Sequence, residues 1–150
     1  MTANRGHPRT GDPTAGSARQ TEGRIKALGA IVMAAGLGKR MRSKLAKVLH
    51  PVAGRPMVLY GVELAERLAS EGVAVVVGHQ GDQVKGVIEA RGPSAAGISR
   101  TFIVEQKEQL GTGHAVMQAR TVFSRERGGP AERYVILNGD TPLLKESTVR

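Results

Sequence analysis

Glycines and cations stand together at one point of the sequence where they could bind phosphate. The segment from Leu28 to Ala35 is apolar apart from Gly29, and Gly36-Leu37-Gly38 follows it directly. Glycine lets backbone N–H groups approach a phosphate closely, because no Cβ stands in the way. The next residues carry side chains that can neutralise a phosphate, namely Lys39, Arg40, Arg42, Lys44 and Lys47. The pattern predicts a loop that binds a phosphate-bearing ligand.

The glycines match neither of two well-defined phosphate-binding motifs. No Gly-Lys-Ser or Gly-Lys-Thr ends the loop, so it is not a Walker P-loop. The third glycine of the dinucleotide fingerprint, which would let a helix pack closely on the strand, is also missing. Taken alone, the segment is also compatible with a strand, a turn and a solvated basic loop. Other motifs are needed to decide between a phosphate-binding loop and a solvated basic loop.

A second polar cluster runs from Gln106 to Gly113. Gly111-Thr112-Gly113 stands where a helix is expected to begin, and its N–H groups and hydroxyl suit the edge of a base or an oxyanion. The amide of Gln106 can pair with the donor and acceptor edge of a nucleobase. The alternative for Thr112 is an ordinary helix N-cap.

A third cluster, Asn138-Gly139-Asp140, contains a candidate metal ligand. An acidic side chain just beyond a buried strand and close to a basic loop can hold Mg²⁺ through one carboxylate. The alternative is that Asp140 only forms a turn, since Asn, Gly, Asp and Pro all favour turns. Three histidines show no metal-ligand spacing, and we predict a structural or hydrogen-bonding role for each: His50, His79 and His114.

The elements that must position these clusters alternate along the chain. Four short apolar runs are predicted strands: residues 27–34, 73–77, 101–104 and 134–137. Helices are expected from Pro56 to a cap at Ser70–Gly72, from an Asp82 N-cap through Ile88, and from Gly111 through Phe123. In the first helix, Met57, Tyr60, Leu64 and Leu68 form the core stripe, and the residues predicted to face away are Glu63, Glu66 and Arg67.

Strand–helix alternation predicts an α/β fold with a Rossmann-like, doubly wound, mainly parallel sheet and helices on both faces. In such a sheet, ligands lie beyond the carboxyl ends of the strands. All three polar clusters follow predicted strands, so we expect them to converge at one edge.

Composition narrows the class of protein. The 150 residues suffice for one domain, and the absence of cysteine excludes disulfides and cysteine-based metal or nucleophile chemistry. Aromatic residues make up 3% of the chain, so the core must be aliphatic. No run of about twenty apolar residues and no signal-peptide core is present, so we expect a cytoplasmic protein without a membrane partner.

The net charge of +9 invites a nucleic-acid interpretation, but its distribution argues against one. Residues 36–56 hold six cations and no acid, and residues 1–24 hold four arginines against two acids. A duplex-binding protein would more often spread its cations along a face. Small phosphorylated ligands explain the cluster better. We expect residues 1–24 to be a disordered basic extension and residues 25–150 to form the folded part.

Three stretches resemble a known family. AAGLGKRMRSKLAKVLHPVAGRPM is similar to the signature of sugar-1-phosphate nucleotidyltransferases. EQLGTGHAV and NGDTPLL narrow the resemblance to the amino-terminal uridylyltransferase domains of the bacterial bifunctional enzymes that make UDP-N-acetylglucosamine. The resemblance implies that UTP and N-acetylglucosamine 1-phosphate give UDP-N-acetylglucosamine and pyrophosphate with Mg²⁺, for cell-wall precursor synthesis. It covers the chain from about Lys26 onward.

The resemblance also implies roles for single residues. Lys47 would contact substrate phosphate, and Arg40 would stabilise the departing pyrophosphate. Asp140 would border the nucleotide and hold the metal. The other residues expected at the nucleotide are Met33, Ala34, Ala35, Gly36 and Gly38 in the first motif, Gln106, Gly111 and Thr112 at the uracil, and Asn138 and Gly139 in the third motif.

Three departures from the family pattern matter. Lys39 stands where the family usually has Thr and adds charge, and Ala46 replaces a proline that would stiffen the loop before Lys47. The chain also stops at Arg150, so we expect a truncated domain that keeps the nucleotide half-site, with the family's trimer limited to the full-length protein. Two alternatives stay open: an inactive nucleotide-binding fragment, or a relative acting on another sugar phosphate or another base.

Overall fold

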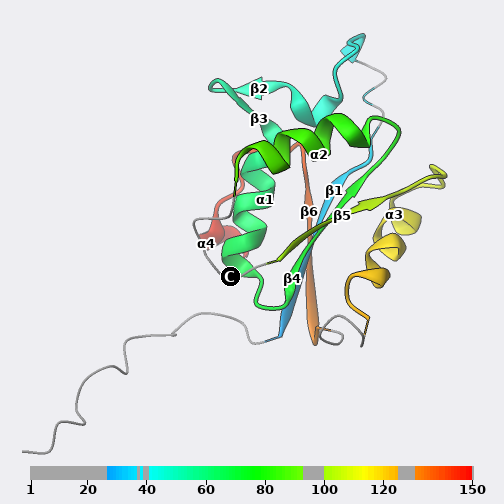
Figure 1. The fold of residues 1–150 in the computed structure, drawn as a ribbon. Helices are drawn as coiled ribbons and strands as arrows, with labels where there is room; N and C mark the ends of the chain where they lie inside the picture. Colours follow the sequence, from blue (N-terminus) through cyan, green and yellow to red (C-terminus); the bar gives the residue numbers. More distant parts are fainter. Residues whose placement is uncertain (1–26, 37, 39–40, 93–99, 125–130, 150) are drawn as a thin grey trace, which may run out of the picture.

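A four-stranded sheet forms the centre of the molecule in the computed structural model (Figure 1). The structure describes residues 27–36, 38, 41–92, 100–124 and 131–149. Every strand pair in this sheet is parallel, and the order is β5-β4-β1-β6. The strands are β1 (Leu28–Ala34), β4 (Gly72–Val77), β5 (Thr101–Glu105) and β6 (Arg133–Asn138). The predicted parallel α/β fold is confirmed.

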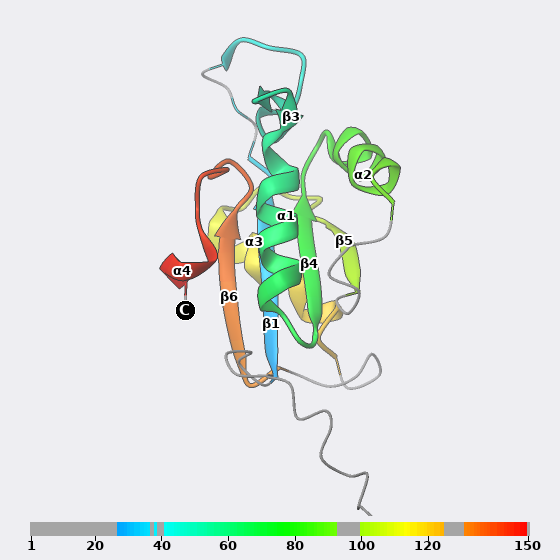
Figure 2. The same cartoon turned by 90° about the vertical axis from the view of Figure 1, so that its left-hand side faces the viewer.

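The chain builds the sheet outward from β1 to β4 and β5, and then returns to the other side of β1 with β6. Crossovers between parallel strands are right-handed, so this reversal moves the connecting helix to the opposite face. Helices α1 (Met57–Leu68) and α2 (Gly81–Ala90) cover one face, and α3 (Thr112–Gln118) with the 3₁₀ turn η3 (Ala119–Thr121) covers the other (Figure 2). The sheet is therefore doubly wound.

The two faces share an aliphatic core. In β4 every residue is buried, as expected for a strand covered on both sides. Val73, Val75 and Val77 belong to the cluster with α1 and α2, whereas Ala74 and Val76 belong to the cluster with α3. The alternation of side chains along the strand produces this division.

Helix α1 is buried on more of its circumference than the sequence predicted, and the prediction for Glu66 is wrong. Glu66 is 1% exposed, and its carboxylate accepts hydrogen bonds from both terminal nitrogens of Arg91 and from the hydroxyl of Thr101. A buried carboxylate needs such partners because burial removes its hydration. This cluster ties α1 to the end of α2 and to β5.

A short hairpin lies directly before α1. Strands β2 (Pro51–Val52) and β3 (Arg55–Pro56) follow the 3₁₀ turn η2 (Lys47–Leu49). The hairpin's two turn residues, Ala53 and Gly54, both have positive φ, as type I′ turns require. Arg55 binds Glu63 with both terminal nitrogens, and this hydrogen bonding is the main cause that raises the pKa of Arg55.

Several predicted boundaries differ from the observed ones. Helix α1 ends at Leu68 with Ala69 extended, so Gly72 is not its cap but the first residue of β4. Gln80 holds the N-cap position of α2, and Asp82 lies inside the first turn. A short α4 (Glu146–Val149) follows the third motif. The predicted extension of residues 1–24 lies outside the described residues. No helix in the described part of the chain has the length and apolar character needed to cross a membrane.

Candidate functional site

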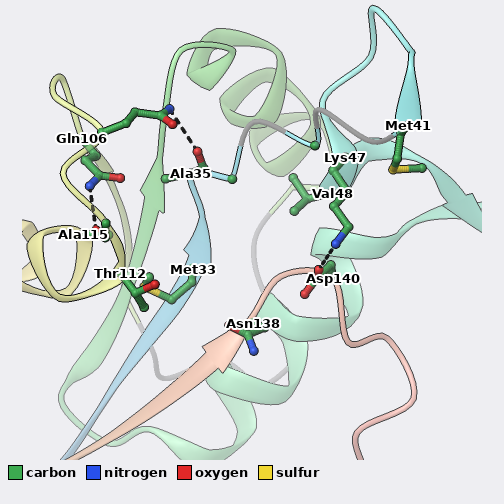
Figure 3. A pocket seen from close by; sticks show the side chains of 14 residues that line it. Met33, Ala35, Met41, Lys47, Val48, Gln106, Thr112, Ala115, Asn138 and Asp140 are labelled. Atoms are coloured by element: carbon green, nitrogen blue, oxygen red, sulfur yellow. Dashed lines mark hydrogen bonds and ion pairs between the residues drawn. The ribbon is translucent and has the colours of Figure 1, made fainter.

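A pocket of about 580 Å³ opens beyond the carboxyl ends of the strands (Figure 3). It lies where β1 and β6 meet, which is the point at which the strand order reverses and where ligands of doubly wound sheets bind. All three polar clusters of the sequence contribute to its wall. The lining residues are Met33, Ala35, Gly36, Gly38, Met41, Lys47, Val48, Gln106, Gln109, Gly111, Thr112, Ala115, Asn138 and Asp140.

One wall of the pocket carries an ion pair between two predicted site residues. Lys47 begins η2, and its ammonium group binds Oδ2 of Asp140 in the loop after β6. The flanking side chains of Ala46 and Val48 are buried and hold this part of the backbone against the core. The two paired side chains are 40% and 30% exposed, so water screens their attraction. Each of the two side chains can therefore leave its partner and bind a ligand at little cost in free energy.

The glycines of the first motif serve different purposes. Gly38 has φ of +56°, and a Cβ there would lie 2.8 Å from Cβ of Lys47, so the fold itself requires glycine. A Cβ at Gly36 would meet nothing within 4 Å. The fold therefore leaves open space beside Gly36, which is one of the residues that line the pocket.

Neighbouring loops hold the backbone of the first motif in place. Nε2 of Gln109 donates to the carbonyl of Ala35 at 3.1 Å, and Nε2 of Gln80 donates to the carbonyl of Lys44 at 2.7 Å. The sequence did not single out four of the lining residues as site residues, namely Gln109, Met41, Val48 and Ala115. The sequence feature that could have identified Gln109 as a site residue is its place inside the second polar cluster. Only its contact with Ala35 distinguishes it from its neighbours.

The opposite wall is built from the second motif. Gln106 is 4% exposed, and its Nε2 donates to the carbonyl of Gly111 at 3.1 Å. Gly111 has φ of +97° and is the N-cap of α3, whereas Thr112 is the first helical residue. The alternative that Thr112 is the N-cap is therefore wrong, and its exposed side chain faces the pocket.

The third motif closes the pocket at the end of β6. The N–H of Gly139 donates to the carbonyl of Met33 at 2.9 Å, which joins the loop after β6 to the end of β1. A Cβ at Gly139 would lie 3.0 Å from that carbonyl oxygen, so the close approach depends on glycine. The exposed side chain of Asn138 lines the pocket.

Two predicted site residues do not line the pocket, and a third lies outside the described residues. The side chain of Ala34 is buried in the core on the α1 face, and Gly139 contributes its backbone behind the pocket wall. Arg40 lies outside the described residues. The other residues predicted to touch the nucleotide line the pocket, and their contacts with a nucleotide remain predictions.

The pocket side chains suit a metal ion that is coordinated partly by the protein and partly by a bound ligand. Within the described ranges, no three His, Cys, Asp or Glu side chains come together as a metal cage. Asp140 presents a single carboxylate to the pocket. Mg²⁺ commonly takes one or two carboxylates and completes its shell with substrate phosphates and water. The residues fit such an ion and do not fit a site built from protein groups alone.

Comparisons with known proteins agree with this architecture. Residues 30–150 match the family described as the MobA-like NTP transferase domain. The chain is 48% identical over 122 residues to the bifunctional protein GlmU of Anaeromyxobacter dehalogenans, and 44% identical over 119 residues to that of Thermus thermophilus. These matches cover 81% and 79% of this chain but only 23% and 24% of the relatives, so the chain spans about a quarter of their length.

Solved structures show the same fold at lower identity. The inositol-1-phosphate CTP transferase from T. maritima matches with a TM-score of 0.56 and 24% identity, over 75% of this chain and 43% of the other. Rv0371C from Mycobacterium tuberculosis H37Rv, solved in complex with manganese, matches with a TM-score of 0.53 and 18% identity, over 82% and 55% of the two chains.

Proposed function

We propose that this chain, which belongs to the MobA-like NTP transferase family, binds UTP in the pocket and supplies the nucleotide half of a uridylyltransferase site. The observation that carries the proposal is the convergence of three separate motifs on one pocket at the reversal of the strand order. The curated relatives at 41–48% identity support the assignment to this part of the family. The proposed second substrate is N-acetylglucosamine 1-phosphate.

The proposed reaction moves a uridylyl group without a covalent protein intermediate. A phosphate oxygen of the sugar 1-phosphate attacks the α-phosphorus of UTP, and a new phosphorus–oxygen bond forms there. The bond between the α-phosphorus and its bridging oxygen to the β-phosphorus breaks, and pyrophosphate leaves with that electron pair. Such transfers depend mainly on positioning and on neutralising charge. Both are functions that a basic pocket wall can perform.

Lys47 and Asp140 are proposed to act together. A triphosphate carries more charge than one carboxylate, so the ammonium of Lys47 would turn from Asp140 to the phosphates. Asp140 would then hold Mg²⁺, which neutralises phosphate charge when it is bound. The manganese complex of a structural neighbour supports a divalent cation. Arg40 is proposed to stabilise the departing pyrophosphate.

The second motif is proposed to bind the base. Gln106 and Gly111 lie on the wall opposite Lys47, so a nucleotide spanning the pocket would place its phosphates at Lys47 and its base at Gln106. The buried amide of Gln106 supplies a fixed hydrogen-bonding partner.

Calorimetric titration of the chain with UTP, CTP and GTP, each with and without Mg²⁺, tests the proposal. We expect Mg²⁺-dependent binding that is tightest for UTP and is lost in Lys47→Ala. Lys85→Ala is the control, because Lys85 lies on the exposed side of α2 and pairs with Glu89. Equal behaviour of the two variants would contradict the proposal.

A second candidate function is nucleotide binding without catalysis. The described groups at the pocket are the ones proposed to bind the nucleotide, and the chain spans 23% of the GlmU protein from Anaeromyxobacter dehalogenans. An assay of pyrophosphate release from UTP and N-acetylglucosamine 1-phosphate separates the two. Turnover by this chain would exclude the second candidate, whereas UTP binding without turnover would support it.

A further inference from the structure

The amide nitrogen of Gln106 has two partners, and together they use both of its N–H groups. Nε2 lies 3.1 Å from the carbonyl oxygen of Gly111 and 3.1 Å from Nδ1 of His114. A primary amide has two N–H donors, so neither is left for a ligand. The amide oxygen remains, and Figure 3 shows it turned towards the interior of the pocket.

The carbonyl of Gly111 favours one orientation of this amide. If the amide were turned by 180°, its oxygen would take the position of Nε2, 3.1 Å from another carbonyl oxygen. Two acceptors at that distance repel each other, and the amide is too deeply buried for water to relieve the repulsion. One N–H of Gln106 therefore points to Gly111, and His114 is the partner that holds the second N–H and keeps the amide in this orientation.

This orientation fixes the tautomer of His114. Since Gln106 donates, Nδ1 of His114 must accept, and the proton of the neutral ring must reside on Nε2. Nε2 lies 3.0 Å from the amide of Gln118, one turn along α3. As placed, its nitrogen faces Nε2 and also donates to the His114 carbonyl at 3.3 Å, so with the proton on Nε2 the Gln118 side chain has to rotate away from that carbonyl to present its oxygen. Gln118 is only half-buried and can make this rotation.

We infer that His114 is a positioning residue that holds the Gln106 amide with its oxygen towards the pocket, and thereby makes the pocket prefer a base that offers an N–H donor. The inference rests on the proposed function and deepens it. The N3 position of uracil is such a donor, whereas N3 of cytosine is an acceptor and would meet the Gln106 oxygen unfavourably. A site whose buried partner is fixed in this way rejects the mismatched base, since one polar group would lose its hydrogen bond.

The selectivity between UTP and CTP tests this role. We expect His114→Ala to lower the ratio of UTP affinity to CTP affinity by about tenfold, because an amide held by Gly111 alone can rotate away from that carbonyl and offer its nitrogen to cytosine. His114→Asn is the matched control, since its Oδ1 can accept where Nδ1 did, and it should keep the wild-type ratio. Equal weakening of both nucleotides in His114→Ala, or an unchanged ratio, would overturn the inference.

A measurement without nucleotide separates this inference from the proposed function. Nitrogen-15 NMR of the wild-type ring should show the proton on Nε2 and an unprotonated Nδ1 at neutral pH. The side-chain amide protons of Gln106 should exchange slowly in the wild type and in His114→Asn, and faster in His114→Ala. A proton on Nδ1 would overturn the inference even if UTP binds. The expected spectra without UTP binding would contradict only the proposed function.

Discussion

The ion pair between Lys47 and Asp140 shows how one residue contact can serve two states of a site. Both side chains are partly exposed, so the pair contributes at most about 1 kcal/mol to folding. Their positions are fixed, since buried neighbours of Lys47 and the backbone contact of Gly139 hold the two side chains next to each other on one wall of the pocket. A ligand can separate them without disturbing the core.

Asp140→Asn tests the metal role at this scale. We expect the variant to bind UTP in Mg²⁺ no better than the wild type does without Mg²⁺, a loss of at least about tenfold or ~1.4 kcal/mol. The reason is that a neutral amide is a poorer ligand for Mg²⁺ than a carboxylate. Calorimetry with Asp82→Asn, an exposed residue of α2, provides the control. A full Mg²⁺ response in Asp140→Asn would exclude the assignment.

The two glycines of the first motif give a paired prediction. Gly38→Ala should destabilise the fold by about 1 kcal/mol or more and weaken UTP binding, because its Cβ would enter a strained backbone and push Lys47 aside. Gly36→Ala should leave the fold intact and weaken only UTP binding, since its Cβ meets nothing in the protein.

Denaturant melting and calorimetry on both variants measure the two effects separately. Wild-type affinity in Gly36→Ala would mean that the phosphates lie elsewhere.

Among the elements, α1 is the one that connects the site to the rest of the fold. Glu63 in its second turn binds Arg55 of the hairpin, and Glu66 in its third turn is buried against Arg91 and Thr101. The buried cluster lies on the side of the molecule away from the pocket, so it bears on stability and not on chemistry.

Arg91→Met should therefore lower stability without changing the site. The guanidinium neutralises the buried carboxylate of Glu66, and breaking a buried pair costs roughly 3–5 kcal/mol. Arg67→Met is the matched control, because the exposed pair of Arg67 with Glu146 at 3.7 Å should be worth about 1 kcal/mol or less. Urea denaturation compares the two. A similar small cost for both would show that the Glu66 cluster does not hold α1 and α2 together.

At the scale of the whole molecule, the sheet is covered unevenly. The core cluster on the α3 face includes residues of β1 and β4, whereas Tyr134 and Ile136 of β6 are 44% and 51% exposed. In the described part of the chain, β6 pairs with β1 on one side only. An exposed apolar edge strand favours association between molecules.

Ile136→Lys should keep the chain monodisperse at higher concentration and leave its melting temperature nearly unchanged, since the side chain is already half in water. Light scattering across a concentration series measures this. Thr148→Lys adds the same charge at an exposed position of α4 and should have a smaller effect. Equal effects of both variants would attribute the change to net charge.

The sequence alone predicted the strands, their parallel arrangement and the edge at which the polar clusters meet. Apolar runs bounded by glycine are local features, and right-handed crossovers leave few ways to join them, so little further information is needed. The three polar clusters meet there because the carboxyl ends of parallel strands lie at one edge. The roles of single residues at the nucleotide came from the resemblance to the nucleotidyltransferase family. Two glycines at this edge permit close contacts between segments: Gly38 lies against Lys47, and Gly139 lies against the carbonyl oxygen of Met33.

Only the tertiary structure decided which side chains become partners. Gln109 binds Ala35 across 74 positions of sequence, Lys47 binds Asp140 across 93, and Glu66 turns inward to meet Arg91. Such contacts depend on how elements pack, which the hydrophobic pattern of one helix does not specify. The tautomer of His114 belongs to the same class, because it is set by hydrogen bonds that exist only once α3 and the loop before it have folded together.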